Sequence, residues 1–469
     1  MLDSLANYRR TLLVACGGSF LAFLDVTITN LALPDIGRDF DGVAIADLSW
    51  VVTLYTVVFA ALLAPAGRIA DAIGRRRLLA AGMLVFTVAS LAAAAAPTYE
   101  LLLAARAIQG LGAALLLPAS LAYVLSDSPP ERRPAAIGLW SASAAVAAAL
   151  GPVVGGILVD VGGWRWLFCI NVPIGAWLVY ETLRLPRVAG SGAGWPDWAG
   201  TTLLGGGVLA VVLGTTQGEA WGWSDPRTLS AVGVGVIACV AAVLRSKAHP
   251  RPAVATHLWR SRTYVAANVV SLAFGASLFA WLLVGVLFVT TVWGYTELEA
   301  GLAMSPGGVV AAFVGIGVSR AGRRVSPRLL VTAGSVALTL VGVAAGVWLP
   351  EEPAFLAYWL PVGLVSGAAV GAVSVGVSSA AALAVAPGDF ASATGLNVAI
   401  RQIGGAIGVA VLAAVLSSGA SPLDLDAYRT VYWLCAAATV VSALAGTLLR
   451  LSTMPPATSS GDEAAVARG

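Results

Sequence analysis

Three charged residues lie inside long apolar segments, where a chain built for lipid would avoid charge: Asp25, Arg106 and Arg401. An ionised side chain at membrane depth costs about 2.5–3.5 kcal/mol on insertion scales, and such residues mark ion or substrate pathways. Burial favours the protonated form of a carboxyl group, whereas a nearby guanidinium favours its ionised form. A carboxyl group that exchanges these surroundings as helices move can bind and release protons.

Asp25 and Arg106 are expected at a similar depth. Asp25 lies about 14 residues, or about 21 Å, into the first apolar segment, and Arg106 about 7 residues, or about 11 Å, from the opposite end of the fourth. In a hydrocarbon core of about 30 Å these positions nearly coincide. We interpret the two as a proton-coupling pair; a fixed ion pair that only orients the helices is the alternative. Arg401, about 10 Å into its segment, fits either a substrate cavity or a snorkelling position.

The segments that hold these residues are predicted transmembrane helices. Of the 469 residues 58% are hydrophobic and only 11% charged, whereas soluble domains carry about 25% charged residues. The apolar segments do not alternate as membrane β-strands do, and backbone groups in lipid must be satisfied internally. We therefore predict an all-α membrane protein with about fourteen spans, at 11–33, 48–66, 78–96, 99–124, 135–160, 166–183, 198–215, 228–244, 264–291, 301–319, 328–349, 355–384, 394–418 and 429–449.

Basic residues predict the orientation and exclude several functions. Arginines cluster before the first segment, after the second, fourth, sixth, eighth and tenth segments, and after the last one. By the positive-inside rule we expect both termini in the cytoplasm and the protein in the inner membrane. The net charge of +3 is spread over short loops, so no nucleic-acid partner is expected. A nucleotide-binding P-loop needs a lysine after a glycine-rich loop. The only lysine, Lys247, follows no such loop, so a P-loop is excluded. The four cysteines lie in separate apolar segments, so neither a disulfide nor a metal site is expected.

Two linkers predict the domain organisation. Residues 186–197 are small and flexible, and residues 245–263 are basic and contain proline. An even number of inserted spans keeps the topology of two similar halves. We predict a six-helix N-terminal bundle, a linker with two additional helices, a six-helix C-terminal bundle and a disordered tail, over residues 1–185, 186–262, 263–450 and 451–469.

Two further motifs suggest moving parts. In the loop after the second segment, Asp71 can pair with arginines and with the positive N-terminus of a neighbouring helix; a plain positive-inside anchor is the alternative. We expect a conformational latch, formed by Gly67, Asp71, Gly74 and Arg75.

In the fifth segment Pro152 removes a helical hydrogen bond and its neighbouring glycines allow close helix approach. We expect a gating helix, with Gly151, Pro152, Gly155 and Gly156 at its bend; generic helix packing is the alternative.

These motifs resemble those of the major facilitator superfamily, and in particular its fourteen-span drug/proton antiporter branch. The resemblance runs from about residue 11 to residue 450, and it departs where the second-half loop 317–328 has no aspartate. The stretches that carry it are Leu24-Asp25-Val-Thr27-Ile-Thr-Asn30, the loop from Gly67 to Arg77, Arg106-Ala-Ile-Gln109-Gly110, Gly151-Pro152-Val-Val-Gly155-Gly156, Trp164-Arg165-Trp166 to Gly175, and Asn397-Val-Ala-Ile-Arg401-Gln402.

The resemblance implies a major-facilitator-type fold of two six-helix bundles plus two extra helices, acting as a monomer and driven by a proton gradient without a cofactor. It also implies that Asp25 and Arg106 face a central cavity between the bundles. The expected residues of the substrate cavity are Tyr55, Asn30, Gln109, Asn397 and Arg401.

We therefore expect a secondary transporter, not an enzyme, that exports hydrophobic or amphipathic drugs or antibiotics in exchange for protons. Its partners would be a small-molecule substrate, protons and the lipid bilayer. A proton-coupled uptake carrier for a nutrient or peptide is the main alternative. A non-transporting membrane scaffold or sensor is another, although such proteins commonly carry a soluble output domain and the longest loop here is too short to fold alone.

Overall fold

The computed structural model describes residues 2–40, 45–186, 197–250, 252–321, 324–417 and 423–450. Within these ranges the chain contains helices and no strand, and 14 helical segments are long and apolar enough to cross a membrane. The predicted all-α membrane fold with fourteen spans is therefore confirmed. The predicted tail at 451–469 lies outside the described residues.

In the described residues, the first six spans and the loops between them contain nine helices, because the first loop adds two short ones and one span is broken. They are α1 (Leu2–Leu31), α2 (Leu33–Asp39), α3 (Ile45–Leu48), α4 (Trp50–Ile73), α5 (Arg75–Ala94), α6 (Tyr99–Asp127), α7 (Arg133–Gly162), α8 (Arg165–Cys169) and α9 (Asn171–Arg184). The sixth span is made of α8 and α9 together.

The remaining spans follow the same plan, and in the described residues short helical turns precede α12, α15 and α16. They are α10 (Trp198–Trp221), α11 (Pro226–Ala248), η1 (Thr256–Arg260), α12 (Arg262–Thr291), α13 (Glu297–Ala321), α14 (Pro327–Val347), η3 (Phe355–Trp359), α15 (Leu360–Leu383), η4 (Pro387–Asp389), α16 (Phe390–Ser417) and α17 (Leu425–Thr447). The long apolar stretch at 355–384 is a single span.

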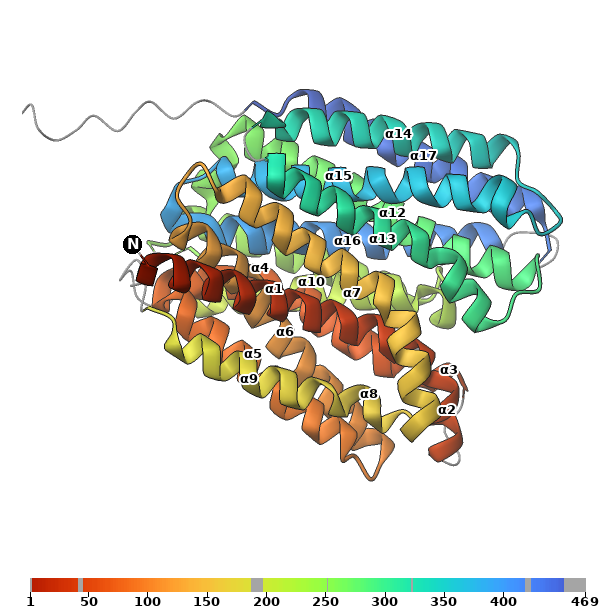
Figure 1. The fold of residues 1–469 in the computed structure, drawn as a ribbon, viewed down its shortest axis with the longest axis horizontal. Coiled ribbons are helices and arrows are strands. Elements are labelled where there is room, and N and C mark those ends of the chain that lie inside the picture. Colours follow the sequence, from red (N-terminus) through yellow and green to blue (C-terminus); the bar gives the residue numbers. More distant parts are fainter. Residues whose placement is uncertain are drawn as a thin grey trace, which may run out of the picture.

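The helices of each half pack mainly among themselves, and a few cross between the halves. In the first half α6 packs on α5 and α4, and α1 packs on α7; in the second, α12 packs on α16 and α14 on α17. Contacts between the halves run through α7 with α13 and through α4 with α16. Figure 1 shows α1 to α9 below and α12 to α17 above, with α7 and α13 side by side between them.

The additional helices α10 and α11 pack against each other, and α10 also contacts α4 and α16. Asp197 caps the start of α10 by accepting a hydrogen bond from the Ala199 backbone at 3.1 Å, and it pairs with Arg245 near the end of α11. The hydrogen bond from Arg245 lowers the pKa of Asp197 to about 2. This carboxylate therefore stays ionised at physiological pH and ties the two ends of the helical pair together.

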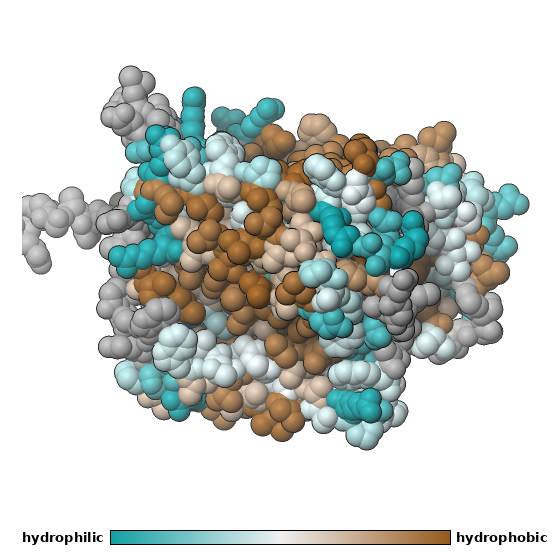
Figure 2. All heavy atoms as spheres, turned by 90° about the horizontal axis from the view of Figure 1, so that it is seen from below, coloured by the Kyte–Doolittle hydropathy of each residue, from teal (hydrophilic) through white to brown (hydrophobic). Residues whose placement is uncertain are grey.

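The outer surface is apolar where lipid would contact it. Large apolar side chains are exposed along α5 and α11, among them Leu84, Val88, Ile237 and Leu244. Figure 2 shows one such face, in which hydrophobic residues dominate the middle and hydrophilic residues gather toward the ends. A multi-pass membrane protein exposes such a band because lipid tails replace water there.

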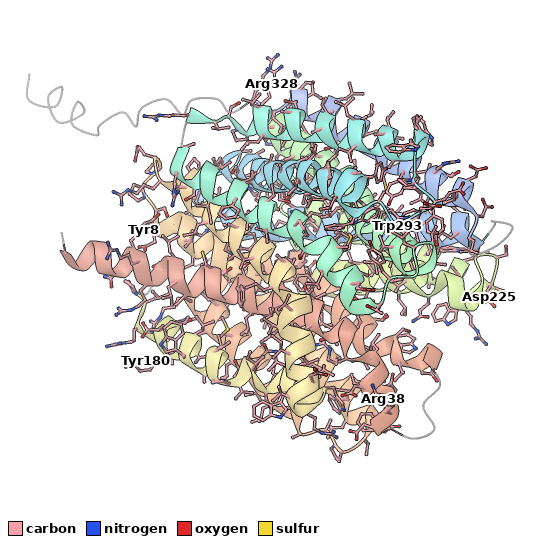
Figure 3. All side chains as sticks on the ribbon, turned by 45° about the vertical axis from the view of Figure 1, so that its right-hand side comes forward. Tyr8, Arg38, Tyr180, Asp225, Trp293 and Arg328 are labelled. Atoms are coloured by element: carbon pink, nitrogen blue, oxygen red, sulfur yellow. The ribbon has the colours of Figure 1, made fainter. Side chains whose placement is uncertain are left out.

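The two ends of the spans carry different charges. Tyr8 and Tyr180 lie toward one end of the helices, and Arg38 and Asp225 toward the other (Figure 3). We call the end with Tyr8 the arginine-rich side, because the span ends on that side carry Arg68, Arg75 to Arg77, Arg132 and Arg133. The opposite side carries Arg38 and Arg165.

The span order predicts that Arg38 and Arg328 are reached from different sides of the membrane, since nine spans separate them. Arg38→Cys and Arg328→Cys are introduced separately into a variant whose four native cysteines are alanine. A membrane-impermeant maleimide should label one of the two cysteines in right-side-out vesicles and the other in inside-out vesicles. Both arginines are exposed, so burial does not limit the labelling. Labelling of both sites in the same vesicles would contradict the topology.

Candidate functional site

Asp25 of α1 lies at the centre of a fully buried polar network. Its carboxylate accepts hydrogen bonds from Arg106 at 2.5 Å, from Gln109 at 2.7 Å and from Asn171 at 2.9 Å. The Asp25 and Arg106 side chains are both 0% exposed. Such a buried pair is tolerated only when further hydrogen bonds satisfy both partners, and here the donors come from α6 and α9.

Arg106 links the network to α4. Its Nε donates to the Val51 carbonyl at 2.9 Å, and its Nη1 donates to Gln109 at 2.5 Å as well as to Asp25. Its guanidinium also lies 4.5 Å from the centre of the Tyr55 ring, a cation–π distance. The sequence prediction that Asp25 and Arg106 are close at one depth agrees with this geometry, whereas their proton-coupling role stays a prediction.

Two members of the network, Ser90 and Asn171, were not among the predicted site residues. Ser90 accepts from Gln109 at 2.8 Å and from Asn171 at 3.4 Å. Asn171 was a visible signal, because an amide within a predicted span needs a buried partner. Ser90 gave no signal, since a serine in a helix commonly bonds to its own backbone.

A cavity of about 370 Å³ lies between the two halves. It is lined from the first half by α1, α4, α6 and α7 and from the second by α12, α13, α15 and α16. Aromatic side chains contribute much of its wall, among them Tyr55, Phe59, Trp140, Trp281 and Trp359. Its size and apolar lining with a few polar groups suit a small organic molecule.

Only some of the residues that the sequence predicted for the cavity line it in the structure. Tyr55 and Arg401 line it, but Asp25, Arg106 and Gln109 do not. These three lie in the buried network of the first half, because their polar groups satisfy one another there. The prediction that Asp25 and Arg106 face the cavity is therefore wrong for this structure.

The two asparagines predicted for the cavity have different outcomes. Asn397 is 1% exposed and donates to the Asn268 side chain at 3.0 Å and to the Ala267 carbonyl at 3.3 Å. It therefore belongs to the contact between α16 and α12 and not to the cavity. Asn30 lies in α1, and its side chain is outside the described part of the structure.

Tyr55 is the residue that joins the cavity to the buried network. It lines the cavity, its ring covers the Arg106 guanidinium, and its hydroxyl donates to the Ala22 carbonyl of α1 at 3.2 Å. A Cβ on Gly110 would lie 2.5 Å from the Tyr55 carbonyl oxygen, so α6 and α4 approach closely at this point. A molecule in the cavity that contacts the Tyr55 ring is therefore separated from the Arg106 guanidinium by that ring alone.

Asp71, on the arginine-rich side, connects the two halves. Its carboxylate accepts from Arg75 at 2.7 Å, from the Ser392 backbone at 2.7 Å and from the Ser392 hydroxyl at 2.7 Å. The Ala391 backbone donates at 3.3 Å. Asp71 therefore holds the positive N-terminus of α16 against the end of α4, which is the arrangement that a latch requires.

Arg75 extends this contact. It donates to Ser126 of α6 and to the Pro387 carbonyl of the second half. Gly74 ends α4 with φ at +108°, a conformation that favours glycine. A Cβ on Gly67 would lie 2.2 Å from the Ala391 carbonyl oxygen, so only glycine permits this approach of α4 to α16.

The predicted gating helix is α7. It stays helical through Pro152, and Figure 1 shows that its last turns run in a different direction from its first. A Cβ on Gly151 would lie 2.4 Å from Thr27 of α1, whereas one on Gly156 would meet no atom within 4 Å. Gly151 therefore makes a close helix contact and Gly155 is buried, but the expected close approach at Gly156 is absent here.

A cavity lined by both helical halves, a buried ion pair and a hydrogen-bonded contact between the halves on one side are features of a membrane transport protein. The sequence matches the Major Facilitator Superfamily over residues 15–409. The chain belongs to that family and is a transporter, which removes the scaffold alternative.

Curated relatives of the chain are similar over most of their length. The puromycin resistance protein pur8 of Streptomyces alboniger is 34% identical, with 89% of this chain and 84% of that protein covered. The methylenomycin A resistance protein of Streptomyces coelicolor is 34% identical, with 86% and 84% covered. The cephamycin export protein CmcT of Amycolatopsis lactamdurans is 32% identical, with 89% and 87% covered.

Solved structures share the fold at low sequence identity. The human organic anion transporter MFSD10 (TETRAN) superimposes with a TM-score of 0.67 at 17% identity, covering 94% of this chain and 99% of that one. The transporter FucP in its outward conformation gives a TM-score of 0.62 at 12% identity, covering 95% and 100%. These two likenesses concern the fold alone.

The contact at Gly67 predicts a stability effect. Gly67→Val should push α4 away from α16 and lower the thermal unfolding temperature of the detergent-solubilised protein, because overpacking costs about 1–3 kcal/mol. Gly206→Val in α10 is the matched control, since a Cβ there meets no atom within 4 Å. Equal unfolding temperatures for the two variants would show that the close approach does not stabilise this state.

Proposed function

We propose that this transporter exports hydrophobic or amphipathic drugs or antibiotics across the cytoplasmic membrane in exchange for protons, as a monomer with both termini in the cytoplasm. The names of its relatives, which include two antibiotic resistance proteins and an antibiotic export protein, support this substrate class. The apolar cavity of about 370 Å³ supports a small organic substrate. The clustering of arginines on the side of Tyr8 supports the orientation.

The observation that carries proton coupling is the fully buried carboxyl group of Asp25. When ionised, it holds Arg106, Gln109 and Asn171 around it. When protonated, it no longer compensates the Arg106 charge, and the attraction between α1 and α6 weakens. Proton binding and release therefore change how these helices are held together.

The network contains hydrogen-bonding atoms that are free to bind the protonated form of Asp25. Among the described residues, Asn171 Oδ1 is buried without a hydrogen-bond donor and Arg106 Nη2 without an acceptor. An asparagine amide turned by 180° exchanges its donor for its acceptor. Asn171 can thus donate to the ionised Asp25 or accept from the protonated one, so both states of the carboxyl group find partners.

Tyr55 couples substrate binding in the cavity to the protonation of Asp25 through its contact with Arg106. Substrate in the cavity contacts the Tyr55 ring, which covers Arg106. The contact between Asp71 and α16 closes the arginine-rich side while the outward-facing exchange occurs. Its release, together with bending of α7, then turns the cavity toward the cytoplasm.

Asp25→Asn is expected to reduce gradient-driven export to below a tenth of wild type while the protein still inserts, because the amide cannot carry the proton. Removing one partner of a buried pair costs about 3–5 kcal/mol, so a second variant is needed. Asp25→Asn combined with Arg106→Gln removes both charges and should fold better yet remain uncoupled.

The measurement is substrate flux in oriented vesicles under an imposed pH gradient, with Asp39→Asn as the control for a surface acid. Wild-type rates in the Asp25→Asn protein would exclude Asp25 as the coupling site. Gradient-driven movement of substrate into the cytoplasm, instead of out of it, would favour the uptake alternative.

Substitutions of Tyr55 separate its ring from its hydroxyl. Tyr55→Phe keeps the ring over Arg106 and should retain most coupled transport, whereas Tyr55→Ala should lower the number of substrate molecules exported per proton. The readout is substrate flux and proton flux measured in the same vesicles. If Tyr55→Ala slows both fluxes in equal proportion, the residue does not couple them.

A further inference from the structure

Arg401 is a cation without a partner inside the cavity. It belongs to the middle of α16, about 16 Å along the helix from Phe390, and it is partly exposed to the cavity that it lines. Among the described residues no salt bridge or hydrogen bond satisfies its guanidinium. Arg106, by contrast, donates to Asp25, Gln109 and Val51.

The cavity offers no internal counter-charge to Arg401. Among the described residues that line it, none besides Arg401 is charged, and the polar groups are those of serines, threonines, tryptophans, Gln402 and Tyr55. The carboxylate of Asp25 does not line the cavity and is already paired with Arg106. A guanidinium at membrane depth without a counter-charge is unfavourable unless water or a ligand compensates it.

The backbone around Arg401 is held in place by close helix packing. A Cβ on Gly275 of α12 would lie 2.1 Å from the Arg401 carbonyl oxygen, and one on Gly404 would lie 2.1 Å from the Leu272 carbonyl oxygen. A Cβ on Gly408 would likewise lie 2.1 Å from the Ala276 carbonyl oxygen. The helix that carries Arg401 thus cannot shift along α12 to move the charge away, and the site is preorganised.

We propose that Arg401 binds the negatively charged group of an amphipathic substrate, so that the transporter selects organic anions, such as carboxylates or phenolates, over cations. This rests on the proposed export function and specifies its substrate class. The apolar part of the substrate would pack on Trp281 and Trp359, while the anion pairs with the guanidinium in the planar geometry that arginine and carboxylate share.

Two xanthene dyes of similar size test this selection: fluorescein, an anion, and rhodamine 123, a cation. Binding to the purified full-length protein is followed by fluorescence anisotropy at neutral pH without any gradient. We expect the wild type to bind fluorescein at least tenfold more tightly than rhodamine 123. Arg401→Gln should weaken fluorescein binding at least tenfold and change rhodamine 123 binding less than twofold.

Arg401→Lys keeps the charge and should preserve the preference for fluorescein, whereas Arg328→Gln, an exposed arginine outside the cavity, should change neither dye. Equal weakening of both dyes by Arg401→Gln, or a wild-type preference for rhodamine 123, would overturn the inference. Because binding is measured without a gradient, selection can hold even where proton-driven export fails. Conversely, gradient-driven export that ignores substrate charge would reject the inference and leave the proposed function intact.

Discussion

The Asp25–Arg106 ion pair is the interaction on which the organisation of the first half depends. Two charges can stay buried at membrane depth only if each is compensated and hydrogen-bonded, and this requirement draws together five helices: α1 with Asp25, α6 with Arg106 and Gln109, α5 with Ser90, α9 with Asn171 and α4 with the Val51 carbonyl. Tyr55 closes the network toward the cavity. The polar centre of the half is therefore also its connection to the cavity.

The second half differs because its deep charge is unpaired. In the part of the chain that the structure describes, no acid pairs with Arg401, and its helix packs closely on α12 at Gly275, Gly404 and Gly408. The proposed division of labour follows from this asymmetry. A carboxyl group with changeable partners suits a proton, which is taken up and released, whereas a fixed, uncompensated guanidinium suits an anionic group on the substrate.

The two largest interfaces between the halves, α7 with α13 and α4 with α16, are held together by different kinds of contact. Along α7 and α13 the contact is made by small residues that pack closely, such as Gly138 against the Gly315 carbonyl and Gly308 against Ala149. At the arginine-rich side Asp71 makes directed hydrogen bonds to the first turn of α16. Directed bonds are either made or broken, and this supports a two-state element at that side.

The sequence by itself determined the spans, their number and the residues that break the apolar pattern, because lipid imposes length and hydrophobicity on each helix separately. It also indicated that Asp25 and Arg106 share a depth, since helical rise converts residue counts into distance. Only the tertiary structure decided which way these side chains face. The sequence could not show that Asp25, Gln109 and Asn397 are satisfied between helices, nor that Ser90 and Asn171 join the network, because rotation of a helix about its axis is set by its neighbours. For the same reason only packing showed that Arg401 reaches the cavity without a partner.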